Sequence, residues 1–164
     1  MTIRVLVADD QAMIRGALAG LLDLEHDIEV VAQAADGAQA LEELARLVSA
    51  DAPAHASAPV DVAIIDVEMP RMDGITATQA IRSRFPGVRV LIVTTFGRPG
   101  YLQRALDAGA TGFMVKDAPV EALADGVRTV AAGGRAVDQS LALEALSAGS
   151  SPLTDREADV LREV

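Results

Sequence analysis

The sequence lacks cysteine and tryptophan, and its 164 residues include only three phenylalanines and one tyrosine. Without cysteine there are no disulfides and no thiolate metal sites, and the scarcity of aromatic rings argues against a base-stacking surface. Basic residues are also few. The chain has 14 Lys and Arg and 24 Asp and Glu, which give a net charge of −10. This negative charge disfavours direct binding of a polyanion by the chain itself.

Long apolar runs are missing as well. No run approaches the roughly 18 residues of a membrane span, and Met1 leads into a short strand without the apolar core of a signal peptide. We therefore expect a cytoplasmic protein without membrane insertion. The hydrophobic content of 51% is enough for one full core with a small remainder of chain.

Short apolar runs alternate with amphipathic stretches along most of the chain. The runs predict five strands, at 3–8, 28–34, 62–65, 89–94 and 112–115. Each is followed by apolar residues at helical spacing, which predict five helices. Strict alternation indicates a parallel sheet with helices on both faces, because right-handed crossovers place them there. The predicted fold class is α/β, a doubly wound five-stranded parallel sheet of flavodoxin-like architecture, (βα)5.

The first predicted helix has an apolar stripe with the spacing i, i+3, i+4, i+7 and i+8. Its members are Ile14, Ala17, Leu18, Leu21 and Leu22. We expect this stripe to face the core.

Four of the predicted strands end on polar side chains. Asp9 and Asp10 follow the first strand, Asp66 the third and Lys116 the fifth, while Thr94 ends the fourth. Because these strands are neighbours in the usual order of such a sheet, the side chains should converge on one edge. Taken singly, each has an ordinary explanation: a helix cap for Asp9 or Asp10, a turn after Asp66, a β-forming threonine or an exposed lysine. Their joint occurrence favours a shared site.

These residue types suit phosphoryl chemistry. Three carboxylates in a small volume repel one another unless a cation lies between them, and Mg²⁺ prefers oxygen ligands. Beside such an ion, Asp66 is suited to attack phosphorus and form an aspartyl phosphate. Lys116 and Thr94 would then contact the phosphoryl oxygens.

At this point the sequence resembles the receiver domain of bacterial two-component response regulators. Four motifs, VADDQ (7–11), IIDVEMPRMDG (64–74), VTTF (93–96) and GATGFMVKD (109–117), stand in the order and spacing of that family. The resemblance covers about residues 2–134 and implies the CheY-like form of the predicted fold. It also implies site roles: Asp66 as phosphoacceptor, Asp10 as direct Mg²⁺ ligand, Asp9 as acidic partner through water, and the Glu68 main-chain carbonyl as a further ligand.

The resemblance also suggests a switch. Thr94 and Lys116 would bind the phosphoryl group, and movement of Thr94 would reshape the loop that follows it. Phe113 stands where many receivers carry Tyr or His, so it is either a switch residue coupled to Thr94 or a plain core aromatic.

The end of the sequence resembles the start of a second domain. Thr154 and Glu157 have the spacing of a helix-capping box, and LTDREADVL (153–161) is similar to the opening of a LuxR-type helix-turn-helix domain. Together with Lys116-Asp117 and the DesR-like segment 95–105, this places the chain with the NarL/FixJ regulators of the DesR type. The implied domains are a receiver at 1–134, a linker at 135–152 and a truncated DNA-binding domain at 153–164.

The expected function follows from that resemblance. A sensor histidine kinase would phosphorylate Asp66, and the resulting change in conformation and homodimerisation would control transcription. Promoter DNA would be bound only by the full-length protein, because the recognition helix is not included. The chain would be no enzyme, but a phosphoacceptor that assists its own phosphorylation and dephosphorylation. Two alternatives are an aspartyl-phosphate phosphohydrolase with Glu68 as general acid, and a pseudo-receiver that is never phosphorylated.

Overall fold

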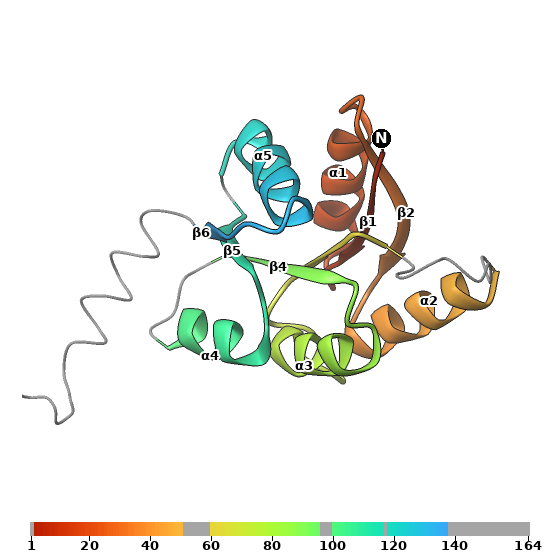
Figure 1. Cartoon of the computed structure of the whole chain (residues 1–164), viewed down its shortest axis with the longest axis vertical. Coiled ribbons are helices and arrows are strands. Elements are labelled where there is room, and N and C mark those ends of the chain that lie inside the picture. The colour runs from red at the N-terminus through yellow and green to blue at the C-terminus, as the bar shows by residue number, and fades with distance from the viewer. Residues whose placement is uncertain (1, 51–59, 96–99, 117, 138–164) are drawn as a thin grey trace, which may run out of the picture.

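The computed structural model describes residues 2–50, 60–95, 100–116 and 118–137, and these contain a parallel sheet in the strand order β2-β1-β3-β4-β5-β6 (Figure 1). The strands are β1 (Ile3–Ala8), β2 (Ile28–Ala34), β3 (Val62–Ile65), β4 (Arg89–Thr94), β5 (Gly112–Val115) and β6 (Ala136–Val137). The predicted fold class and its five strands are confirmed. Their bounds are predictable because each strand is a short apolar run between polar or turn residues.

The sixth strand was not predicted. Gly133, with φ +95°, turns the chain after the last helix, and Ala136 then donates its amide to the Thr111 carbonyl at 3.1 Å. This pairing covers the edge of β5 that would otherwise leave backbone groups unpaired. The first residues of the expected linker therefore extend the sheet, whereas its remainder and the expected DNA-binding segment 153–164 lie outside the described residues.

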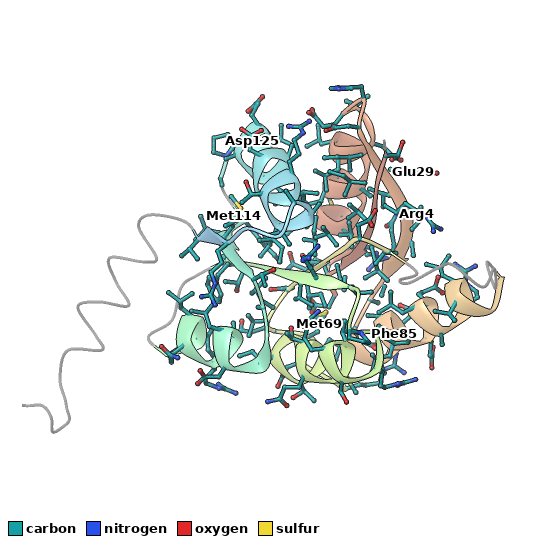
Figure 2. All side chains as sticks on the ribbon, in the orientation of Figure 1. Arg4, Glu29, Met69, Phe85, Met114 and Asp125 are labelled. Carbon is teal, nitrogen blue, oxygen red and sulfur yellow. The ribbon has the colours of Figure 1, made fainter. Side chains whose placement is uncertain are left out.

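Helices cover both faces of the sheet. On one face lie α1 (Ala12–Asp23) and α5 (Val120–Ala131), and on the other lie α2 (Gly37–Ala50), α3 (Gly74–Arg84) and α4 (Tyr101–Ala108) (Figure 1). Each face has its own apolar core. Figure 2 labels one member of each: Met114 on the α5 side and Met69 on the α3 side. None of the helices in the described ranges is long and apolar enough to cross a bilayer.

The predicted buried stripe of α1 is wrong in part. Leu22 is fully buried, and Ile14 and Leu18 are half-buried, but Ala17 and Leu21 are exposed. The helix is apolar on more than one side, so spacing alone cannot identify the side that packs. Its second apolar row faces outward and ends in two highly exposed residues, Met13 and Leu24.

Candidate functional site

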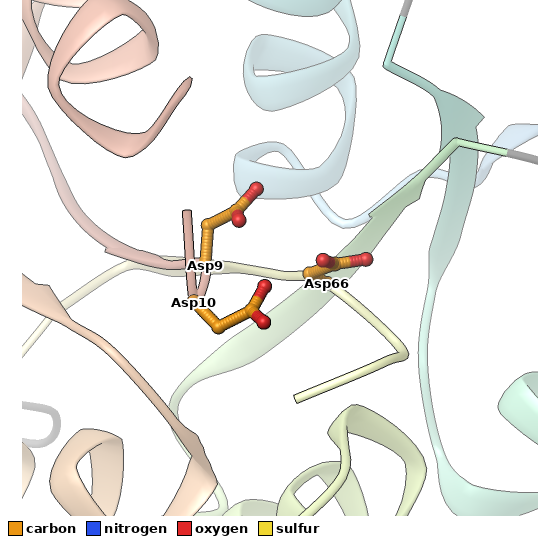
Figure 3. Close-up of side chains that lie close together, drawn as sticks. All are labelled: Asp9, Asp10 and Asp66. Carbon is orange, nitrogen blue, oxygen red and sulfur yellow. The ribbon is translucent and has the colours of Figure 1, made fainter. Parts of the chain in front are cut away.

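Parallel pairing of β1 with β3 brings two acidic residues to the same edge of the sheet. Ala8 pairs with Ile65, and Asp9 and Asp66 are the next residues on their strands. Both are buried, with 1% and 6% of their surface exposed, whereas Asp10 is exposed. Carboxylate oxygens of the three residues lie within 4.8 Å of one another (Figure 3). The predicted convergence of the acids is thus present.

Lys116 reaches this cluster from the end of β5. Its Nζ lies 2.6 Å from Asp9 Oδ2 and 3.0 Å from Asp66 Oδ2. The chain has no other lysine. Backbone pairing sets its position, because the Lys116 amide donates to the Thr94 carbonyl at 2.8 Å and so continues the β4–β5 ladder. A single ammonium therefore bridges two buried carboxylates.

The other predicted site residues surround this bridge at different depths. Thr94 is buried at the end of β4, beside Lys116. Phe113 is fully buried in the core on the α2–α4 face of the sheet. Glu68 is exposed, and the Tyr101 hydroxyl donates to its carboxylate at 3.4 Å. The roles of Thr94, Phe113 and the Glu68 carbonyl remain predictions.

Burial dominates the electrostatics of the site. It raises the pKa of Asp66, and the nearby Asp9 charge acts in the same direction, while Lys116 partly offsets both. For Lys116 the balance is reversed: burial lowers its pKa, but hydrogen bonds to Asp9 and Asp66 outweigh this, so its pKa lies above the ordinary value. Both shifts show that the surroundings of Asp66 favour positive charge: they favour a proton on Asp66 and keep Lys116 protonated.

The loop after Asp66 is tightly closed. The Gly74 amide donates to the Val67 carbonyl at 2.8 Å, and Asp73 caps α3 by accepting from the Thr76 amide at 2.8 Å. A Cβ atom on Gly74 would overlap the Asp66 carbonyl oxygen. Glycine is required there because the start of α3 touches the backbone of the acidic residue.

Sequence reasoning offered helix capping as an alternative role for Asp9 and Asp10. The N-cap of α1 is instead Gln11, whose amide donates to Asp9 Oδ1 at 2.9 Å just before the helix. Sequence reasoning also missed Arg15, which donates from Nη1 to the Asp9 carbonyl at 2.8 Å. An arginine one helical turn after two acidic residues is a sequence signal that could have identified this contact. Asp117, whose residue type also suits a helix cap, lies outside the described residues.

The donor set fits a hard divalent cation. Asp9, Asp10 and Asp66 supply carboxylate oxygens, and the one neighbouring ammonium leaves the group of four with a net negative charge. Two full negative charges 4.8 Å apart or closer repel by roughly 3 kcal/mol or more at an effective dielectric constant of about 20. A cation such as Mg²⁺, which prefers carboxylate oxygens, would relieve that repulsion.

Comparison with known proteins agrees with this geometry. Residues 5–128 match the response regulator receiver domain family. The chain is 41% identical to the transcriptional regulatory protein DesR of Bacillus subtilis (strain 168), over 99% of this chain and 74% of DesR. It is 37% identical to the oxygen regulatory protein NreC of Staphylococcus epidermidis (strain ATCC 35984) over 84% of this chain and 59% of NreC.

Solved structures give the same result. A NarL signal receiver domain from Mycobacterium tuberculosis is 36% identical, with a TM-score of 0.68, over 80% of this chain and 98% of that one. A LuxR-family response regulator from Aurantimonas sp. SI85-9A1 has a TM-score of 0.75 at 28% identity, over 90% of this chain and 97% of that one. The chain therefore belongs to the two-component response regulators, in the NarL/LuxR family with DesR-like relatives, and carries their CheY-like receiver domain.

Proposed function

We propose that this receiver domain accepts a phosphoryl group on Asp66 from the phosphohistidine of a sensor histidine kinase, in the cytoplasm. The observation that carries the proposal is the Lys116 ammonium, which lies between the buried carboxylates of Asp9 and Asp66 at the carboxyl edge of the sheet. A lysine that merely ended a strand would extend into water. This one is turned inward onto two acids, where an incoming phosphoryl group would need positive charge.

The transfer is a displacement at phosphorus. An Asp66 carboxylate oxygen forms a bond to phosphorus, the bond from phosphorus to the histidine nitrogen breaks, and the imidazole leaves with the electron pair. Lys116 lies close enough to Asp66 to stabilise the negative charge on the phosphoryl oxygens. The Thr94 hydroxyl, at the neighbouring strand end, would donate a hydrogen bond to one of them.

Asp9, Asp10 and Asp66, together with the Glu68 main-chain carbonyl, would hold Mg²⁺ beside the acceptor. When bound, the ion supplies positive charge to the attacking carboxylate and the phosphoryl oxygens. Asp9 and Asp10 directly follow the last residue of β1, so the sheet fixes the position of the backbone that carries their side chains. Arg15 and the Gln11 amide bind the carbonyl and carboxylate of Asp9 and so orient it.

The same site would also remove the phosphoryl group slowly. In this proposal the chain is a phosphoacceptor that assists its own phosphorylation and dephosphorylation, rather than an enzyme that turns over an external substrate. The exposed position of Glu68 supports this view, since a general acid for a bound substrate needs a protected position beside the nucleophile.

The outward row of α1 supports a protein partner. Met13 is 88% exposed and Leu24 79% exposed, and a Cβ on Gly16 or Gly20 would meet nothing within 4 Å. A helix face that is apolar and smooth suits docking of another helix. We infer that the kinase or a second phosphorylated copy binds there. Homodimerisation would then bring two C-terminal DNA-binding domains to promoter DNA in the full-length protein.

The proposal is tested by incubating the chain with Mg²⁺ and acetyl phosphate and measuring its intact mass. We expect one phosphoryl adduct, stable in acid and labile in base, that disappears in Asp66→Ala and on removal of Mg²⁺. Continuous release of phosphate from ester substrates would favour a phosphohydrolase instead. No adduct on the folded wild-type chain would favour a pseudo-receiver.

A further inference from the structure

A second ion pair links the loop after Asp66 to another part of the fold. The Arg71 guanidinium donates from Nε, at 2.9 Å, and from Nη2 to the same oxygen, Oδ2, of Asp36. Asp36 is 2% exposed, whereas the Arg71 side chain is 70% exposed. The arginine thus covers a buried acid located 35 residues earlier in the chain.

The other oxygen of Asp36 has a separate partner. Oδ1 accepts from the Gln39 amide at 2.8 Å, at the start of α2. This amide and the Arg71 guanidinium lower the pKa of Asp36 against the opposing effect of burial. Both carboxylate oxygens are therefore occupied, one by a helix terminus and one by the loop that follows β3.

Arg71 has an unfavourable backbone conformation. Its φ is +66°, the only positive φ at a non-glycine residue in the described ranges. The Met72 amide donates to the Pro70 carbonyl at 2.7 Å, so Arg71 is the central residue of a γ-turn. Such a conformation costs about 1–3 kcal/mol and persists only where surrounding contacts enforce it.

A second contact joins the same two segments. The Gly37 amide, at the start of α2, donates to the Met72 carbonyl at 3.1 Å. A Cβ on Gly37 would lie 2.7 Å from that carbonyl oxygen, so the helix terminus and the turn are in direct contact. The turn belongs to a loop that begins at Asp66, contains Glu68 and closes at Gly74.

We propose that the Asp36–Arg71 pair is a positioning element that holds the γ-turn in place and thereby sets the loop geometry at the phosphoacceptor. This inference rests on the proposed function, since the loop carries Asp66 and the expected Glu68 carbonyl ligand. The alternative is a purely structural tie, which would change global stability and leave the properties of the folded site unchanged.

Two variants remove the pair in different ways. Asp36→Asn keeps a side-chain oxygen for the Gln39 amide but removes the charge, and asparagine is a good helix cap. Arg71→Gly removes the guanidinium but tolerates a positive φ, and the replaced side chain is largely exposed. Arg46→Ala, which breaks an exposed pair with Glu43 on α2, is the matched control.

The readouts are Mg²⁺ affinity and amide hydrogen exchange. As the only lysine, Lys116 gives one ε-carbon NMR signal beside the site, and its shift follows Mg²⁺ titration. We expect each variant to weaken Mg²⁺ binding by roughly tenfold, as the loss of partners that orient metal ligands does. Exchange of the Met72 and Gly37 amides should accelerate. The double variant should bind Mg²⁺ no more weakly than either single variant, because the two residues act as a pair.

Unchanged Mg²⁺ affinity and unchanged exchange in the folded variants would overturn the inference, and so would the same changes in Arg46→Ala. Failure of the wild-type chain to bind Mg²⁺ or form the adduct would count against the proposed function instead. The exchange measurement needs no ion, so in that case it still decides whether the pair holds the loop.

Discussion

The Lys116 ammonium lies 3.0 Å from the Asp66 carboxylate, although fifty residues separate the two in the chain. The contact exists because β3, β4 and β5 are adjacent and parallel, so their ends form one edge. Asp66 is buried and its pKa is raised, which makes this ammonium its main source of positive charge among the described residues.

Removal of the ammonium should impair phosphoryl transfer. Lys116→Ala leaves Asp66 without its cationic partner, and loss of one such donor typically lowers a rate by about 10²-fold or more. We expect a fall of that order in adduct formation from acetyl phosphate at saturating Mg²⁺, measured by intact mass against time. Lys116→Arg keeps the charge, so it should slow adduct formation less than Lys116→Ala does. Equal rates for Lys116→Ala and the wild type would exclude a role for the ammonium.

The raised pKa of Asp66 makes stability depend on pH. The folded chain keeps this proton to a higher pH than the unfolded chain, so wild-type stability falls as pH rises from 3.8 through the raised pKa. Asp66→Asn lacks this loss. Its Tm should exceed that of the wild type at pH 7 without Mg²⁺, and the two should converge near pH 3. Added Mg²⁺ should raise the Tm of the wild type more than that of Asp66→Asn. A variant less stable at pH 7 would contradict this reading.

Asp27 should show the opposite dependence. Its hydrogen bond with Arg128 lowers its pKa to about 2, so its contribution is present above pH 3.8 and is lost as pH falls towards about 2. Asp27→Asn should therefore lower Tm at neutral pH, and the difference should vanish in acid. Thermal unfolding between pH 7 and pH 2 measures this. A difference that persists at pH 2 would point to lost packing rather than lost charge.

Replacement of two glycines by alanine should change the free energy of unfolding in opposite directions. Gly74→Ala places a methyl group against the Asp66 carbonyl, and overpacking of this kind costs about 1–3 kcal/mol. Gly20→Ala, on exposed α1, should raise the free energy of unfolding by about 0.5–1 kcal/mol, because glycine is a poor helix former. Urea unfolding compares the two. A neutral Gly74→Ala would mean that the loop after Asp66 has room to relax.

The exposed row of α1 should matter for binding and not for folding. Met13→Glu and Leu24→Glu change side chains that are mostly in water, so Tm should change little. We expect both to weaken phosphotransfer from a kinase, or dimerisation after phosphorylation, by tenfold or more. Val48→Glu, an exposed apolar position on α2, is the control. Loss of function in Val48→Glu alone would move the partner surface to the other face of the sheet.

The strands and the cluster of acids could be predicted from the sequence because both depend on local pattern. A run such as Val62 to Ile65 is a buried strand wherever it occurs in a parallel sheet, and strand order then brings its end beside that of β1. The position of Asp66 next to Asp9 follows from those two facts alone.

What could not be predicted depends on three-dimensional packing. Leu21 and Leu22 are equally apolar neighbours on α1, and only the docked helix shows that one is buried and the other exposed. The Asp36–Arg71 pair joins segments that are not adjacent in sequence, and its γ-turn leaves no compositional mark because Arg71 is not glycine. The sixth strand depends on where the chain leaves α5.

We propose that Asp66 itself carries the phosphoryl group, and trapping with borohydride can identify the residue that does. Borohydride reduces an aspartyl phosphate to homoserine, so peptide sequencing of the chain treated with Mg²⁺ and acetyl phosphate identifies the acceptor. We expect homoserine at position 66 and unmodified Asp9 and Asp10. Homoserine at position 9 or 10, or at an acid outside the cluster, would contradict it.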